Sequence, residues 1–92
     1  MPVVVQLPAV LRPLAKDNEH VEISGADSVG AVFAVLGEEY PALRRRLTDD
    51  QGALRRHVNV FLGDDNIRDL SDLRTPVSDG DVLLVLPSIS GG

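Results

Sequence analysis

The chain of 92 residues is long enough for one domain with a single core of modest size. Its formal net charge is −5 and 3% of its residues are aromatic, so it lacks the basic face and the stacking platforms that nucleic acids require. An acidic surface instead favours a basic protein partner. The absence of cysteine excludes disulfides, thiolate metal ligands and a cysteine nucleophile.

No stretch of the sequence reaches transmembrane length. The N-terminus has neither the basic start nor the long apolar segment of a signal peptide. We therefore expect a cytoplasmic protein that is a monomer on its own and that contacts neither membranes nor nucleic acid.

Two strands are predicted in the first quarter of the chain. Residues 3–7 are rich in β-branched side chains and stop at Pro8. Residues 20–23 alternate polar and apolar side chains, which predicts the second arm of a hairpin with one wet face. Residues 11–18, which include Pro13, are expected to form a connecting loop. In the first strand, alternation places on one face Val3, Val5 and Leu7.

One main helix is predicted to follow. Ser28 is suited to cap its first turn, and Pro41 disfavours helical angles at Tyr40 and should end it there. Gly37 weakens the helix by about 1 kcal/mol relative to alanine, so we expect the helix to depend on packing against a sheet. Residues 43–47 are predicted to add one more turn, with arginines outward. The apolar stripe at helical spacing consists of Val29, Val32, Phe33, Leu36 and Tyr40.

The second half of the chain returns to strands. Residues 58–62 form a third predicted strand, with Phe61 outward. Residues 63–66 have turn composition, and we expect Ile67 and Arg68 to start a short return strand. The surface segment that follows, at residues 69–76, is predicted to be tied down by Leu70 and Leu73.

A tight turn at residues 79–81 leads into the last predicted strand, at residues 82–86. This strand is apolar on both faces, which is typical of a central strand. The most apolar strands are thus the first and the last, and the helix and strands between them supply the long crossover that parallel pairing needs. We predict an α+β fold of the β-grasp (ubiquitin-like) type, with one main helix packed across a mixed sheet. Residues 1–87 form the domain, and residues 88–92 form a flexible tail.

The tail carries no charge except the terminal carboxylate and ends in Gly91 and Gly92. Glycine has no Cβ, so such an end can enter a slot that is too narrow for any side chain. Fully extended, residues 87–92 reach about 20 Å, which is enough to enter a buried pocket while the domain stays outside.

These features resemble the ubiquitin-like sulfur carriers of the MoaD/ThiS family over essentially the whole chain. The resemblance rests on the closing run from Asp79-Gly80-Asp81 through Leu86-Pro87 to Gly91-Gly92. It also includes the segments Leu11-Arg12-Pro13, Ser28-Val29-Gly30 and Val58-Asn59-Val60. The first and third segments, with Asp64-Asp65-Asn66 and Ile67-Arg68, look most similar to the CysO-type carriers of actinobacteria.

The resemblance implies a protein cosubstrate and not an enzyme. An adenylyltransferase of the ubiquitin-activating type, with or without a rhodanese domain, would use ATP and Mg²⁺ to adenylate the carboxylate of Gly92. A sulfur donor would then displace AMP and leave a thiocarboxylate. The sulfur acceptor of CysO-type carriers is a cysteine synthase that uses pyridoxal phosphate. No cofactor is expected to stay bound to the carrier, and because the chain ends on Gly92 no processing is expected.

The partners are expected to contact the sheet face away from the helix and the tail itself. The candidate residues for this contact are Phe61, Val4, Leu84, Leu86, Pro87, Ser88, Ile89 and Ser90. Acidic residues that can border this face are Asp64, Asp65, Asp79 and Asp81. The sequence does not settle which side chains of the last strand face outward. The only reactive group expected is the carboxylate of Gly92, with Gly91 beside it.

Three other readings stay open. The same activated Gly92 suits a covalent protein modifier that ends in an isopeptide bond with lysine. The chain also suits the small subunit of molybdopterin synthase, or a noncovalent β-grasp module that happens to end in glycines. His20 and His57 have no second ligand at metal spacing and are expected to be surface residues, so no metal site is predicted.

Overall fold

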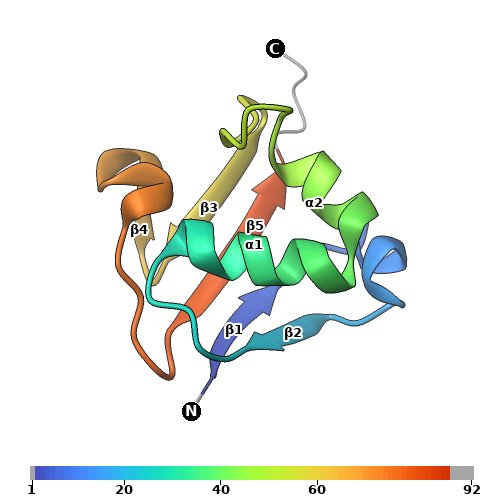
Figure 1. Cartoon of the computed structure of the whole chain (residues 1–92), viewed down its shortest axis with the longest axis horizontal. Helices are drawn as coiled ribbons and strands as arrows, with labels where there is room; N and C mark the ends of the chain where they lie inside the picture. Colours follow the sequence, from blue (N-terminus) through green and yellow to red (C-terminus); the bar gives the residue numbers. More distant parts are fainter. Residues whose placement is uncertain (1, 88–92) are drawn as a thin grey trace.

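The computed structural model describes residues 2–87, in which helices cover one face of a five-stranded sheet (Figure 1). The elements in chain order are β1 (Val3–Gln6), η1 (Arg12–Ala15), β2 (His20–Ile23), α1 (Val29–Glu39), α2 (Pro41–Leu47), β3 (Val58–Leu62), β4 (Asp65–Asn66), η2 (Ile67–Asp69), η3 (Asp72–Arg74) and β5 (Val82–Pro87). Each η is a short 3-10 helix.

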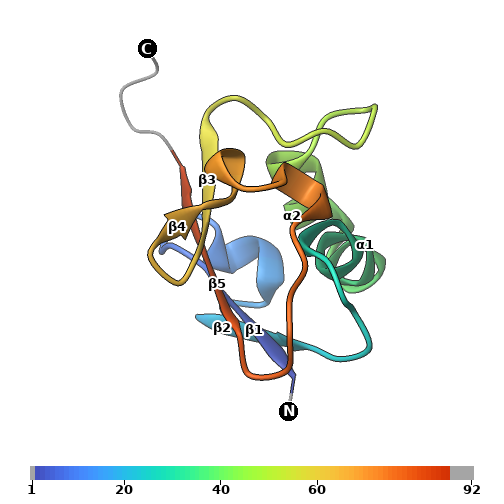
Figure 2. The ribbon, with the colours of Figure 1, turned by 90° about the vertical axis from the view of Figure 1, so that its left-hand side faces the viewer.

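The strand order in the sheet is β2-β1-β5-β3-β4, so the last strand of the chain lies in the middle. β5 pairs in parallel with β1 and antiparallel with β3, while β1 pairs antiparallel with β2. This arrangement confirms the predicted β-grasp, including the hairpin of the first two strands and the parallel pairing of the first and last. Figure 2 shows the sheet and the helices as two separate layers.

The main helix begins and ends where the sequence predicts. Ser28 Oγ accepts a hydrogen bond of 3.1 Å from the backbone N–H of Ala31 and so caps α1. Tyr40 is the C-cap residue of α1, and α2 begins at the next residue, Pro41. Gly37 allows the side chain of Arg44 on α2 to pack closely against α1, because a Cβ at residue 37 would overlap that side chain.

The short return strand lies earlier than predicted. It is β4, at Asp65–Asn66, and Ile67 and Arg68 belong to η2 instead. The reason is local: Asn66 Oδ1 accepts a hydrogen bond of 3.0 Å from the N–H of Arg68, which caps a tight turn and ends the strand. The turn brings Ile67 into the core, where it is fully buried.

The segment after η2 is anchored differently from the prediction. Leu70 is 45% exposed, so it does not tie the segment down, although Leu73 does pack against the core. The buried residues here are Thr75 and Val77. Thr75 Oγ1 accepts a hydrogen bond of 3.0 Å from the N–H of Ser71, which satisfies a buried hydroxyl that sequence periodicity does not reveal.

Two further boundaries differ from the predictions. The loop at residues 11–18 contains η1, whose Ala15 is fully buried with Leu11 beside it in the core. β5 runs one residue further than expected because Pro87, at the end of the strand, still lies opposite Val58. Among the described residues, no helix is long and apolar enough to cross a membrane.

Candidate functional site

The structure settles the orientation of the side chains of β5. Leu83 and Val85 are fully buried beneath the helices. Val82 and Leu86 are each 40% exposed, and Leu84 between them is half-buried, so these three side chains lie on the outer face of the sheet. A central strand that is apolar on both faces therefore buries one face and leaves the other open.

Neighbouring strands extend this open surface. Val4 lies opposite Val82, and Phe61 lies opposite Leu84. Both side chains are half-buried and lie on the same face as their partners, because residues opposite one another in a sheet point to the same side. We call this surface the apolar face, and it consists of Val4, Phe61, Val82, Leu84 and Leu86. Large exposed apolar groups on one sheet face are typical of an interface.

The structure thus brings four of the five predicted domain residues together on this face, without Pro87, and adds one residue that was not predicted. Val82 belongs to the apolar face, and the alternation with Leu84 and Leu86 is the signal that identifies it. The face ends at a polar border on β3 and β4, where Asn66 Nδ2 donates a hydrogen bond of 3.3 Å to Asn59 Oδ1.

The four candidate border aspartates lie at one end of this face. Asp64 and Asp65 follow β3, while Asp79 and Asp81 precede β5, and β3 and β5 run in opposite directions. Their common end of the sheet is the one remote from Pro87. Asp81 Oδ2 accepts a hydrogen bond of 2.8 Å from the N–H of Ser78, so this carboxylate shapes the turn before β5.

The chain leaves the sheet at Pro87, which is half-buried and lies opposite Val58. Residues 88–92 follow directly, and the predictions for Ser88, Ile89, Ser90, Gly91 and Gly92 fall outside the described residues. A hollow of about 120 Å³ borders Pro87. It is lined by Val10, Leu11, Arg46, His57, Val58 and Pro87. Val10 is 68% exposed and was not predicted as part of the site.

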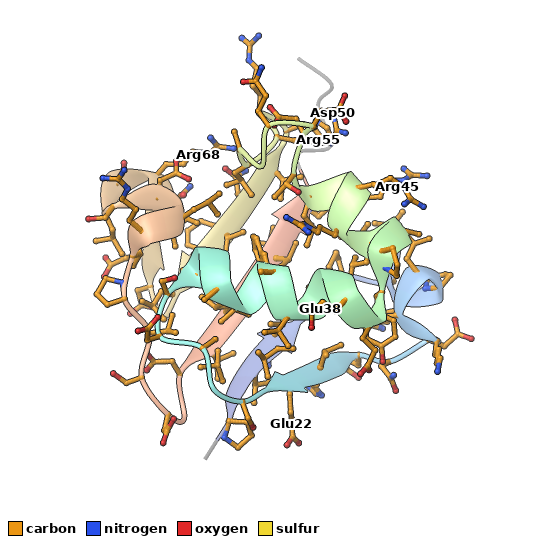
Figure 3. The ribbon with its side chains drawn as sticks, viewed as in Figure 1. Glu22, Glu38, Arg45, Asp50, Arg55 and Arg68 are labelled. Atoms are coloured by element: carbon orange, nitrogen blue, oxygen red, sulfur yellow. The ribbon has the colours of Figure 1, made fainter. Side chains whose placement is uncertain are left out.

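Arginines gather at this end of the molecule. Arg45 and Arg55 lie there with Asp50, on α2 and on the loop before β3 (Figure 3). Arg55 Nε donates a hydrogen bond of 2.8 Å to the carbonyl of Arg45, which holds the loop against α2. Arg68 Nη2 donates to the carbonyls of Arg55 and Val58 at 2.6 and 2.7 Å, which ties the loop to β3.

Residues 2–87 contain no group of three or more His, Cys, Asp or Glu side chains that could hold a metal ion. His20 and His57 are both exposed, as expected. The features of this domain that are suited to binding are therefore the apolar face and the segment that follows β5.

A β-grasp domain with an apolar face on its central strand, followed in the sequence by Gly91 and Gly92, is typical of a ubiquitin-like protein. Residues 5–92 match the ThiS family, and the chain belongs to that family. The predicted resemblance to MoaD/ThiS carriers is thereby confirmed.

Three relatives place the chain more closely. It is 37% identical over 94 residues to the sulfur carrier protein CysO of Mycobacterium tuberculosis, with both chains covered completely. Its fold matches CysO in the crystal structure of the Amycolatopsis orientalis BexX/CysO complex, with a TM-score of 0.88, 29% identity and coverage of 98% and 99% of the two chains. It is also 37% identical over 65 residues to small archaeal modifier protein 3 of Haloferax volcanii, covering 71% of this chain and 70% of the relative.

Proposed function

We propose that this protein is a sulfur carrier and that its reactive group is the C-terminal carboxylate of Gly92. The observation that carries the proposal is the match to the ThiS family, which extends to residue 92 and so includes the Gly-Gly tail. The full-length similarity to a sulfur carrier supports the same function.

The chemistry follows from the weakness of a carboxylate as an acyl donor. An adenylyltransferase that uses ATP and Mg²⁺ joins the Gly92 carboxylate to the α-phosphate and releases pyrophosphate. A persulfide or sulfide then attacks the acyl carbon, and AMP leaves, so that one carboxylate oxygen is replaced by sulfur. When a persulfide supplies that sulfur, its S–S bond is cleaved by a reductant such as a second thiol. The resulting thiocarboxylate serves as the cosubstrate of a sulfur-accepting enzyme.

The similarity to CysO directs the choice of acceptor. We propose a cysteine synthase that uses pyridoxal phosphate, for which the thiocarboxylate sulfur is the nucleophile. The carrier itself supplies no catalytic side chain to this reaction. Its contribution is to be recognised through the apolar face and to deliver the tail into the partner's active site.

The proposal is tested by measuring the intact mass of the protein after incubation with the adenylyltransferase from the same genome, ATP, Mg²⁺ and sulfide. We expect the mass change of one oxygen replaced by sulfur, confined by fragmentation to residue 92. A variant that lacks Gly92 is the control and should keep its original mass. An unchanged mass of the full chain, under conditions where the enzyme adenylates another carrier, contradicts the proposal.

The role of the apolar face has its own matched comparison. Leu84→Ser removes an apolar side chain from the centre of the face, whereas Val35→Ser changes a side chain on α1 that is 38% exposed in the helix layer. We expect Leu84→Ser to weaken binding to the adenylyltransferase about tenfold or more, since truncating a central interface residue costs on the order of 1–2 kcal/mol. Equal binding of both variants contradicts a role for the face.

A second candidate function is covalent modification of other proteins. The observation that favours it is the 37% identity to an archaeal modifier protein. Both functions share adenylation of Gly92, and they differ in the attacking group, which is sulfur in one and a lysine amine in the other. Peptides from the producing cells that carry Gly-Gly remnants on lysine, lost when Gly92 is deleted, identify the modifier.

A further inference from the structure

The end of the molecule where the chain leaves β5 is basic, although the chain as a whole is acidic. Five of the nine basic residues lie there, on α2 and on the loop that precedes β3. We call them the arginine collar, and they are Arg44, Arg45, Arg46, Arg55 and Arg56. The sequence pattern of these arginines favours an ordinary solvated helical edge over a contact with a partner or an anion.

The hollows at this end show that the collar reaches the tail exit. Arg46 and His57 line the hollow that borders Pro87. The same two residues line a second hollow with Arg45 and Arg55. Arg45 and Arg55 in turn share a third hollow with Arg44. Arg56 lines a fourth hollow with Arg55 and His57. The collar arginines therefore line hollows that share residues with one another, and the first of these hollows borders Pro87.

The domain offsets only part of the positive charge of the collar. Among residues 2–87, none of its five arginines forms an ion pair, and four of them are exposed while Arg55 is half-buried. Asp49 and Asp50 line one of the same hollows. Asp49 Oδ1 accepts hydrogen bonds from the N–H groups of Gln51 and Ala53, which hold this carboxylate in its own loop. Two carboxylates thus stand beside five arginines, and the collar keeps a net positive charge.

Stability of the fold accounts for only part of the arrangement. Cations in the last turn of a helix interact favourably with its dipole, which explains a preference for arginine at residues 44–46. The hydrogen bond from Arg55 to the carbonyl of Arg45 then fixes further positive charge against this helix end. Five like charges held together beside only two carboxylates, Asp49 and Asp50, still repel one another and lower stability. Their clustering therefore points to a role in binding.

We propose that the arginine collar docks onto a carboxylate-rich rim around the entrance to the adenylyltransferase active site that receives the tail. This proposal rests on the proposed sulfur-carrier function, and it adds that the partner surface around the entrance is negatively charged. Charges beside the tail steer the encounter so that the tail faces the entrance, because complementary charges raise association rates and fix orientation. The collar contains no aromatic residue and the chain has a net charge of −5, so a protein surface fits better than a nucleic acid.

The test uses two variants with the same change in net charge. Arg45→Glu/Arg46→Glu reverses two charges of the collar, and Lys16→Glu/Arg74→Glu reverses two exposed charges that line none of its hollows. Association of each full-length variant with the adenylyltransferase from the same genome is measured by stopped flow at low and high ionic strength. Far-ultraviolet circular dichroism and thermal melting verify that both variants are folded.

We expect the collar variant to associate about tenfold more slowly than the control at low ionic strength. The difference should shrink at high ionic strength because salt screens exposed charges. Once bound at saturating carrier, the collar variant should be adenylated at the wild-type rate. Equal association rates of the two variants, with normal adenylation of the wild type, overturn the collar proposal and leave the sulfur-carrier function standing.

Two other outcomes are also decisive. A wild-type protein that is not adenylated at all overturns the proposed function and the collar proposal with it. The nucleic-acid alternative is examined by titrating the isotope-labelled protein with a short DNA duplex. Binding of the duplex through the collar arginines, combined with unchanged enzyme association of the collar variant, also overturns the proposal.

Discussion

At the scale of single residues, several side chains stabilise the domain through contacts that sequence patterns predict only in part. Ser28 was recognisable as a cap because a serine precedes an apolar stripe at helical spacing. Asn66 was not recognisable as a cap, because turn-forming asparagines occur in many loops. Only the structure shows that its side chain accepts a hydrogen bond from the N–H of Arg68. Local chemistry therefore predicted the start of α1 correctly and misplaced the return strand by two residues.

Tyr40 gives a residue-scale prediction about pH. Its side chain is buried, and its pKa is raised above the usual 10 by a hydrogen bond to the Glu39 carboxylate, by burial and by the negative charge of Glu39, against an opposing hydrogen bond from Asn18. The folded state thus keeps the phenol proton longer than the unfolded state. Stability from this group is complete below pH 10 and is lost as pH rises from about 10 through the folded pKa.

Tyr40 is the only tyrosine in the sequence, so its titration can be read directly from the ultraviolet absorbance of phenolate. We expect a midpoint above 10 in the folded protein and a midpoint near 10 in urea. Glu39→Gln should lower the folded midpoint, because it removes the carboxylate acceptor. The control Glu38→Gln, one residue earlier on the exposed face of α1, should not change it. Equal midpoints in folded and unfolded protein contradict this assignment.

At the scale of elements, β2, β3 and the main helix were predictable from a clear apolar period, and β1 and β5 from their runs of apolar residues. The orientation of β5 was not, because both of its faces are apolar and alternation then gives no preference. Only the register against β1 and β3 shows that Leu83 points inward and Leu84 outward. The apolar face was therefore predicted in outline, with Val82 missing from it.

This orientation predicts a strong difference between two adjacent leucines. Leu83→Ala should lower the free energy of unfolding by about 3 kcal/mol, since it opens a cavity beneath the helices. Leu84→Ala should cost less than about 1 kcal/mol, because its side chain already contacts solvent. Urea denaturation of the two variants measures both values. Equal costs would show that the inward and outward faces of β5 are assigned wrongly.

The loop before β3 gives a second prediction at this scale. Arg68→Lys keeps the charge and removes a planar group that donates to the carbonyls of Arg55 and Val58. The N–H groups of Arg55 and Val58 donate to the carbonyls of Leu47 and Arg55, so they are protected only while the loop keeps this conformation. We expect their hydrogen exchange to accelerate about tenfold, since the lost hydrogen bonds from a charged group contribute on the order of 1.5 kcal/mol to holding the loop. Arg56→Lys, on an exposed neighbour, is the control and should leave exchange unchanged. Unchanged exchange in Arg68→Lys contradicts this role.

At the scale of the whole molecule, charge and apolar surface are distributed along one axis. The aspartates that border the apolar face lie where β5 begins, and the arginine collar lies where β5 ends. Net charge alone predicted an acidic surface that prefers a basic partner, and it concealed the basic end. The distribution depends on how α2 packs beside the loop before β3, which is a long-range property that no local pattern encodes.

The central position of β5 also predicts how the molecule opens. Amides of β1 and β5 should exchange only through global unfolding, because both strands are paired on both sides. Amides of the two-residue edge strand β4 should exchange through local opening with a lower free energy. Native-state hydrogen exchange at increasing denaturant separates the two classes. A lower opening energy for β5 than for β4 would contradict the observed strand order.

The same strand order determines when the sheet can form during translation. During translation β1 and β3 emerge from the ribosome well before residues 82–87, yet the sheet has no middle until those residues have left the exit tunnel. A nascent chain that stalls before that point exposes two strand edges that attract other chains or proteases. A chain can therefore complete its sheet only after the strand that precedes the glycines has been made.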